Sequence, residues 1–510
     1  MKTATQTQPA GNAPASQRLM SVDALRGFDM FWIIGADSLV YALSRMSQTR
    51  PTTFLADQLE HAEWEGFHFY DLIFPLFVFI VGVSLVFSLT KTIQQAGRAE
   101  AVKRVFRRSV LLFAVAIFYS GGFTSPWPDI RLMGVLNRIA IAYFFAGLLF
   151  CFFKPRALVA TCVAILAGYW ALMTFTPIRD IQLTRSNLAQ LAEKAGDKKT
   201  ADLFNDERNP SAVKDSPAWA AAEKMFYATT NRVTGKFDKG LNLANHVDFE
   251  YLPARKYDTF FDPEGFLSNL PAVATCLLGV FAGLLLRQGS VPRVGGIGSA
   301  MAGVAVALLY AAFRIHCYPG EPSWIRDLTQ QSVGHAFALS LFVSYIFFIG
   351  EAIALGSFVA FLLHREASRE ERKAYLLLVA GVTAVLLGWL WNAQFPIIKK
   401  IWTSSYVLVA GGYSAILLGI FYQIVDVWQA RAWCQPFVWM GMNSITVYLA
   451  SNILGGFRKL ATRFVGGDVR IFFDGHVAKG FGDMVISIVG LLLAFWLVHF
   501  LYKRKIFLRL

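Results

Sequence analysis

Charged residues are scarce in this 510-residue chain, making up 16% of it, whereas hydrophobic residues make up 55%. This composition is too apolar, over too great a length, for a single soluble core. The lipid bilayer must therefore be the solvent for most of the chain. That excludes an ordinary soluble globular protein.

Cysteine is also rare, and no two cysteines have the spacing of metal ligands. We therefore expect no structural disulfide and no metal site. The chain has no GxGxxG or P-loop motif that would position phosphates. It also has no tandem repeat and no inverted pair of glycine- or proline-broken helices, which weighs against a secondary transporter. The five cysteines are Cys151, Cys162, Cys276, Cys317 and Cys434.

Long apolar runs are what the sequence has in place of charge. A helix needs about 20 mainly apolar residues to cross the hydrocarbon core, and the chain offers about twelve such runs. We therefore predict an all-α polytopic membrane bundle of about 12 transmembrane helices. The expected spans are 22–45, 68–90, 106–123, 131–153, 156–176, 266–287, 295–316, 335–363, 373–391, 402–427, 435–455 and 481–503.

Basic residues gather in alternate connections between these runs, which accounts for the net charge of +14 without a nucleic-acid partner. The connection after the second run alone carries Lys91, Arg98, Lys103, Arg104, Arg107 and Arg108. Cytoplasmic connections are enriched in Lys and Arg. The pattern therefore predicts that both termini are cytoplasmic.

The same topology divides the chain into four parts. Residues 1–17 are expected to be a disordered cytoplasmic tail, because they are polar and no short apolar segment with a cleavage site follows them. Residues 18–176 form an N-terminal membrane bundle, and 266–510 form a C-terminal one. Between them, 177–265 is expected to form a small extracytoplasmic cap. Its segment 182–239 is expected to form short polar helices, with too little apolar surface for a core of its own.

Four charged residues lie in the first apolar run and need an explanation, because a lone charge in a bilayer is costly. Asp23 and Arg26 are three positions apart and can neutralise each other. Asp29 and Asp37 are expected on roughly one helical face, about 12 Å apart along the axis. Asp37 would then face the bundle interior, near the outer side.

The outer connection at about 46–67, together with the start of the second run, concentrates the groups needed for proton transfer. Histidine suits proton transfer near neutral pH, and a neighbouring carboxylate can orient the ring. His61 and Asp71 are therefore candidate catalytic residues, and an ordinary interfacial histidine is the alternative. Glu63 and Trp64 lie between them and are candidates for holding a substrate.

Polar residues inside two later runs are further candidates. Arg131, Asn137 and Arg138 lie at or within the fourth run, where an arginine needs a carboxylate, a phosphate or water. An ion pair with Asp29 or Asp37 is as good an explanation as a ligand. Asn443 and Ser444 lie in the eleventh run, where such groups bond across helices or contact a ligand.

Six short motifs in this order resemble the heparan-α-glucosaminide N-acetyltransferase family and its bacterial relatives. They are SVDALRG, HAEW with DLIFPLFVFIVG, IRLMGVLNRIA, FDPEGFL, GMNSITVYL and LYKRKIF. The resemblance covers about residues 20–510. It implies a membrane enzyme that transfers the acetyl group of cytoplasmic acetyl-CoA to the amine of an extracytoplasmic glucosamine-type sugar.

The resemblance also implies site residues. His61 matches the family's active-site histidine, and Asp37 occupies the position of an assisting asparagine. That departure matters because a carboxylate can orient His61 but cannot donate an amide hydrogen bond. Asp262 and Glu264 of the FDPEG motif are expected at the substrate side, with Glu63 and Trp64. Acetyl-CoA, the co-substrate, is expected near Arg26, Arg131, Asn137, Arg138, Asn443 and Ser444.

Two catalytic routes remain open at this point. His61 acts as the general base on the attacking amine, or it accepts the acetyl group first. Asp37 and Asp71 would hold its ring. An inner-membrane transporter of an amino sugar or anion is the alternative function. The expected location is a bacterial cytoplasmic membrane, with His61 toward the periplasm and membrane lipid around the bundle. The oligomeric state is open, with a homo-oligomer among the alternatives.

Overall fold

The structure is a computed structural model of the chain, and it describes most of residues 19–508. Residues 123, 125, 127–128, 207–215, 292 and 318–335 lie outside the described part, and for 315–317 and 336–347 only the backbone is described. The expected tail, 1–17, also lies outside it.

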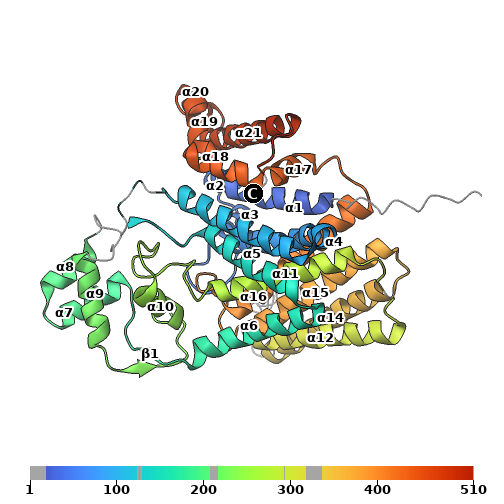
Figure 1. The fold of residues 1–510 in the computed structure, drawn as a ribbon, viewed down its shortest axis with the longest axis horizontal. Coiled ribbons are helices and arrows are strands. Elements are labelled where there is room, and N and C mark those ends of the chain that lie inside the picture. Colours follow the sequence, from blue (N-terminus) through green and yellow to red (C-terminus); the bar gives the residue numbers. More distant parts are fainter. Residues whose placement is uncertain are drawn as a thin grey trace, which may run out of the picture.

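Long helices run side by side and form one elongated bundle (Figure 1). Within the described residues, 8 helices are long and apolar enough to cross a membrane. A further helix, α14 (Ala336–His364), covers another expected span. The 8 are α4 (Phe69–Tyr119), α5 (Val135–Phe152), α6 (Pro155–Phe175), α11 (Asn269–Arg287), α12 (Gly296–Cys317), α15 (Arg369–Trp391), α16 with η3 (Ser404–Phe421 and Tyr422–Val427) and α21 (Phe481–Lys503).

Two of the expected spans lie within α4, which consists of two helices joined at Gly97, where φ is 84° and ψ is 175°. Glycine tolerates this backbone because it has no Cβ. The chain turns back there, because Arg104 donates to Thr92 at 3.0 Å across the turn. The basic connection is therefore helical on both sides of a tight turn at Gly97.

The first expected span is broken into α1 (Met20–Phe31), the π-helical turn η1 (Trp32–Ala36) and α2 (Asp37–Met46). Gly35 has a φ of 122°, which no regular helix contains. The expectation that Asp29 and Asp37 share one helical face was therefore wrong, because it assumed an unbroken helix. The eleventh span is likewise divided, at Asn443, into α17 (Gln435–Met442) and α18 (Ser444–Ile453).

Close helix contacts at glycine hold the bundle together. A Cβ on Gly82 of α4 would lie 2.0 Å from the carbonyl oxygen of Cys276 on α11. A Cβ on Gly279 of α11 would lie 1.9 Å from the carbonyl oxygen of Phe79. Small residues let membrane helices approach this closely. The main apolar core fills the space between these helices, α5 and α16.

The cap lies beyond one end of the long helices (Figure 1). It contains α7 (Arg185–Lys194), α8 (Lys198–Asn205), α9 (Pro217–Ala228), α10 (Leu243–Tyr251) and an antiparallel pair of strands, β1 (Ile178–Arg179) and β2 (Arg232–Val233). Trp219, Phe249 and Phe260 are central to an apolar cluster within it. Of these three, only Trp219 lies within 182–239, so the polar helices of that segment pack into a core that later cap residues complete.

Three shorter helices flank α2 and α21. Helix α3 (Arg50–Gln58) follows α2 and leads into the connection that carries His61. Helices α19 (Phe457–Val465) and α20 (Asp468–His476) pack against α21. Asp483 of α21 forms ion pairs with Arg45 of α2 and Arg470 of α20, so these ion pairs connect α2 and α20 to α21.

Candidate functional site

His61 and Asp71 form a hydrogen-bonded pair at the entrance to α4. The Nδ1 atom of His61 lies 2.8 Å from Oδ1 of Asp71. The carboxylate is almost fully buried, and its Oδ2 accepts backbone N–H groups from Ala62 at 3.2 Å and His68 at 3.0 Å. Asp71 lies in the first turn of α4, where a carboxylate interacts favourably with free N–H groups. The same interactions that start the helix therefore fix Asp71 beneath His61.

This geometry assigns the tautomer of His61. An ionised carboxylate only accepts hydrogen bonds, so the proton of the neutral ring lies on Nδ1. Nε2 is then the nitrogen that can accept a proton. About half of the side chain is exposed, so a substrate can reach it.

Lys399 completes the cluster, and the sequence reasoning did not single it out. Its Nζ lies 2.9 Å from Nδ1 and 3.3 Å from Nε2 of His61, and 3.3 Å from Oδ1 of Asp71. If Nζ lay in the plane of the imidazole at these distances from Nδ1 and Nε2, it would collide with the ring carbon between them. The amine of Lys399 therefore lies over the face of the ring. Burial lowers the pKa of Lys399, and the charge of Asp71 opposes that shift.

A rigid connection between α15 and α16 holds Lys399. Ile397 accepts a hydrogen bond from the N–H of Gly66 at 2.9 Å, which joins this connection to the one carrying His61. Tyr169 donates to the carbonyl oxygen of Ile401 at 2.6 Å. One sequence signal pointed here: Lys399 and Lys400 are adjacent cations in a connection that the charge pattern assigns to the outside.

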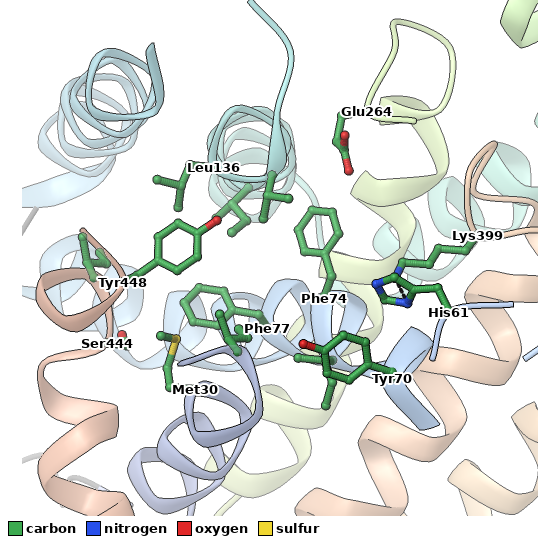
Figure 2. Close-up of a pocket in the computed structure, with 15 residues that line it drawn as sticks. Met30, His61, Tyr70, Phe74, Phe77, Leu136, Glu264, Lys399, Ser444 and Tyr448 are labelled. Carbon is green, nitrogen blue, oxygen red and sulfur yellow. Dashed lines mark hydrogen bonds between the residues drawn. The ribbon is translucent and has the colours of Figure 1, made fainter. Parts of the chain in front are cut away.

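A pocket of about 240 Å³ opens beside this cluster. His61, Lys399 and Glu264 lie toward one end of it, and Phe74, Phe77 and Met30 lie deeper (Figure 2). Helices α5 and α18 also contribute to the lining, through residues that include Leu136, Ile139, Ser444 and Tyr448. The pocket therefore joins a polar entrance to an apolar interior between helices.

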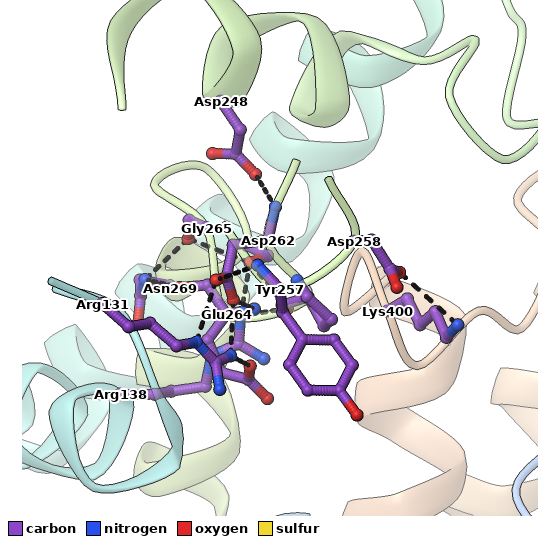
Figure 3. Close-up of polar contacts among 12 residues, drawn as sticks. Arg131, Arg138, Asp248, Tyr257, Asp258, Asp262, Glu264, Gly265, Asn269 and Lys400 are labelled. Carbon is purple, nitrogen blue, oxygen red and sulfur yellow. Dashed lines mark hydrogen bonds and ion pairs between the residues drawn. The ribbon is translucent and has the colours of Figure 1, made fainter. Parts of the chain in front are cut away.

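Arg131 positions the FDPEG loop at the pocket entrance (Figure 3). Its Nε and Nη2 donate to the two oxygens of Asp262 at 3.1 and 2.8 Å, and Nη2 also donates to Glu264 at 2.7 Å. Two parallel bonds of this kind fix geometry as well as charge. Glu264 lines the pocket, whereas the fully buried Asp262 carboxylate holds the loop. Burial raises the pKa of Glu264.

Arg138 does not pair with a carboxylate of the first helix, so that expected alternative was wrong. It is buried, donates to the carbonyl oxygen of Pro263 at 2.7 Å and to the hydroxyl of Ser268, and lies over the ring of Trp402 at 4.4 Å. Its hydrogen bonds go instead to Pro263 of the FDPEG loop and to Ser268, which follows that loop. Arg138 thus supports the loop from below.

Asp248 of the cap supports the same loop from above. It accepts backbone N–H groups from Phe266 at 2.9 Å and Asp262 at 3.4 Å. A Cβ on Gly265 would lie 1.8 Å from its Oδ2, so only glycine fits there. Burial raises the pKa of Asp248 to about 7. A titratable group therefore lies directly behind Glu264.

Three other candidates lie away from the pocket lining. Asp37 is half-buried at the start of α2, and within the described residues no hydrogen bond joins it to His61. Glu63 is exposed to solvent. The indole of Trp64 donates to the carbonyl oxygen of Phe237 at 2.8 Å, so this side chain attaches the His61 connection to the cap.

The candidates for binding acetyl-CoA are dispersed. Arg26 is bonded to Asp23, as expected, and also to Ser84 and Gly441. Asn137 is buried, with no hydrogen-bond partner for its side chain in the described part of the chain. Asn443 bonds the carbonyl oxygen of Trp439 at 3.3 Å. Ser444 lines the pocket.

No group of three or more metal-ligating side chains is placed to hold a metal ion in the part of the chain that the structure describes. The chemistry available at the site comes from an imidazole, an amine and two carboxylates. These groups suit proton transfer and stabilisation of a developing negative charge.

The fold and site define a polytopic helical membrane protein with a histidine, aspartate and lysine cluster at the mouth of an intramembrane pocket. Residues 18–199 match the family model for the catalytic region of heparan-alpha-glucosaminide N-acetyltransferase. This part of the chain is therefore similar to the catalytic region of that family.

Two relatives extend the similarity beyond that region. Heparan-alpha-glucosaminide N-acetyltransferase of Mus musculus is 22% identical over 523 residues, which cover 98% of this chain and 62% of the mouse protein. The Homo sapiens protein of that name is 22% identical over 480 residues, covering 88% of this chain and 55% of the human protein. The chain thus spans about three fifths of the length of these relatives.

Proposed function

We propose that this protein is a membrane N-acetyltransferase that moves the acetyl group of acetyl-CoA to the amine of a glucosamine-type sugar. The observation that carries the proposal is the contact of His61 with both Asp71 and Lys399 at the mouth of the pocket. The match of residues 18–199 to the acetyltransferase family model supports it.

His61 is the general base in the proposed reaction. An amine must be neutral to attack a thioester, and Nε2 of His61 accepts the proton that the amine loses. Asp71 keeps Nδ1 protonated and balances the positive charge that the ring acquires. A base positioned in this way accelerates a reaction by roughly 10²–10⁴-fold.

Lys399 stabilises the negative charge that forms on the thioester oxygen. As the amine nitrogen bonds to the acetyl carbon, the carbonyl electron pair moves onto oxygen, and a protonated Lys399 lies beside that position. The C–O double bond then reforms, the C–S bond breaks, and CoA leaves as a thiolate that takes up a proton. Transfer through an acetyl-histidine would use the same groups in two steps.

Glu264 binds the amino sugar at the entrance. Its carboxylate lines the pocket beside Lys399, and Arg131 fixes its position. A carboxylate there attracts the ammonium form of the acceptor before the proton is lost. Asp262 contributes by holding Arg131, and Glu63 contributes at the exposed rim.

Acetyl-CoA, the acetyl donor, enters from the end of the bundle opposite to His61 and Glu264. The charge pattern places both termini and the basic connections in the cytoplasm, where acetyl-CoA is found. The apolar depth of the pocket, from Phe74 to Met30 and Ser444, suits the acyl end of the thin pantetheine arm. The bilayer in question is the cytoplasmic membrane of a bacterium, with His61 toward the periplasm.

The test is release of free CoA by the full chain in lipid nanodiscs, given acetyl-CoA and glucosamine. We expect His61→Ala to abolish acetylated product and His476→Ala to leave it unchanged, because His476 is an exposed residue of α20. If the wild type released no CoA across a panel of amino sugars and moved labelled glucosamine unchanged instead, the protein would be a transporter.

A further inference from the structure

A second cavity lies in the membrane-embedded surface of the bundle, between α4 and α5. Its volume is about 230 Å³, and seven of the eight side chains that line it are apolar. The residues that define it are Phe106, Val110 and Phe113 on α4 and Ile141, Phe144 and Phe145 on α5. We call it the α4–α5 groove.

The groove opens away from the bundle interior. Phe106 is 59% exposed, Val110 51% and Phe145 50%, although all three are large apolar side chains. None of the residues that line the groove also lines the pocket beside His61. In a bilayer this surface faces lipid, so the groove is separate from the proposed active site.

Two unpaired cations lie one helical turn from the groove. Lys103 precedes Phe106 and Val110 by three and seven positions, and Arg107 precedes Val110 by three, so all four share one face of α4. Both cations are exposed, and in the described residues no carboxylate pairs with either. The neighbouring cations are already engaged, because Arg104 donates to Thr92 at 3.0 Å and Arg108 lies over the ring of Tyr143.

We propose that the α4–α5 groove binds an anionic phospholipid, with one acyl chain in the groove and the phosphate at Lys103 and Arg107. The groove supplies an apolar channel for the chain. The two cations lie where the headgroup of a lipid seated in that channel would be. A basic cluster at the membrane surface attracts anionic lipid by about 1 kcal/mol for each Lys or Arg.

CoA also carries phosphates that Lys103 and Arg107 could bind, so it is the alternative ligand. The separation of the groove from the pocket beside His61 favours the lipid. A phosphate held at the α4–α5 groove would lie on the outer face of the α4–α5 pair. The acetyl end of its pantetheine arm would have to reach the pocket on the inner face. The lipid needs no such path.

The test is native mass spectrometry of the purified full chain, counting retained phosphatidylglycerol against phosphatidylcholine with the same acyl chains. We expect the wild type to prefer phosphatidylglycerol, and Lys103→Gln with Arg107→Gln to lower that preference roughly tenfold or more. Ile141→Trp should reduce retention of phosphatidylglycerol by filling the groove. The matched control is Lys503→Gln with Lys505→Gln, which removes two exposed cations at the end of α21.

Each outcome decides the proposal. Equal retention of the two lipids by the wild type would overturn it. So would a loss of the preference for phosphatidylglycerol in Lys503→Gln with Lys505→Gln as large as in Lys103→Gln with Arg107→Gln. Calorimetric titration of acetyl-CoA on Lys103→Gln with Arg107→Gln separates the two sources of phosphate. Loss of acetyl-CoA binding with unchanged lipid retention would also overturn the proposal. None of these measurements requires catalysis, so they are independent of the proposed enzymatic function.

Discussion

The Nζ atom of Lys399 lies 2.9 Å from Nδ1 of His61, although 338 positions separate the two residues in the chain. The contact joins the connection before α4 to the connection between α15 and α16. It brings an amine with a lowered pKa beside an imidazole and a carboxylate. The N-terminal and C-terminal bundles therefore both contribute to one site.

Asp71→Asn should lower kcat by roughly 10²–10⁴-fold, because a carboxamide neither balances charge on the ring nor reliably keeps the proton on Nδ1. The measurement is CoA release under saturating donor. Thermal unfolding should change much less than for Asp71→Ala, since the amide oxygen can still accept an N–H group at the start of α4. An unchanged kcat for Asp71→Asn would rule out Asp71 as the partner of the base.

Lys399→Gln should lower kcat with little effect on KM for the amino sugar, since the charge is needed only as the oxyanion forms. In the wild type, activity should fall at alkaline pH, because Lys399 loses its proton below the ordinary lysine value of 10.5. Lys399→Arg keeps the charge at higher pH, so this alkaline limb should move upward. Lys400→Gln is the control, and an identical profile for Lys399→Arg and wild type would contradict the role.

Arg131→Met should destabilise the FDPEG loop, because it leaves the buried carboxylate of Asp262 without its guanidinium partner. Breaking such a pair costs about 3 kcal/mol when little solvent reaches it. We expect a lower unfolding temperature and weaker binding of the amino sugar, with Glu264 released. Arg255→Met provides a comparison, because Arg255 is exposed and reaches this segment through its backbone N–H, which donates to the carbonyl oxygen of Ile130 at 3.2 Å. Equal effects of the two changes would argue against a specific role of Arg131.

Asp248 should make the protein less stable as the pH rises. Its folded pKa is about 7, above the ordinary value of 3.8, so the folded state holds a proton that the unfolded chain releases. The stabilisation that protonated Asp248 adds to the free energy of unfolding is therefore fully present below about pH 4 and is lost as the pH rises through 7. Asp248→Asn should flatten this part of the curve of unfolding temperature against pH, and the exposed Asp202→Asn should not. A slope retained in Asp248→Asn would assign it to another group.

The helical class and most element positions could be predicted from sequence, because each apolar run must satisfy its own backbone hydrogen bonds in lipid. The breaks could not be predicted in the same way. Gly35 and Gly97 both adopt a positive φ that interrupts a helix. Other glycines, such as Gly82 and Gly279, lie within unbroken helices and permit close helix contacts. Which of these a glycine does depends on the helices packed around it.

The pairing of His61 with Asp71 was accessible from sequence because both residues serve one local element, the start of α4. Periodicity, charge and short motifs are local properties, so they were enough to predict the membrane class, most helix positions and His61 as a candidate. Packing was needed to show that Lys399 joins the site, that Arg131 holds the FDPEG loop, and that Trp64 contacts the cap. Those contacts depend on which helices lie side by side, and packing between distant segments sets that arrangement.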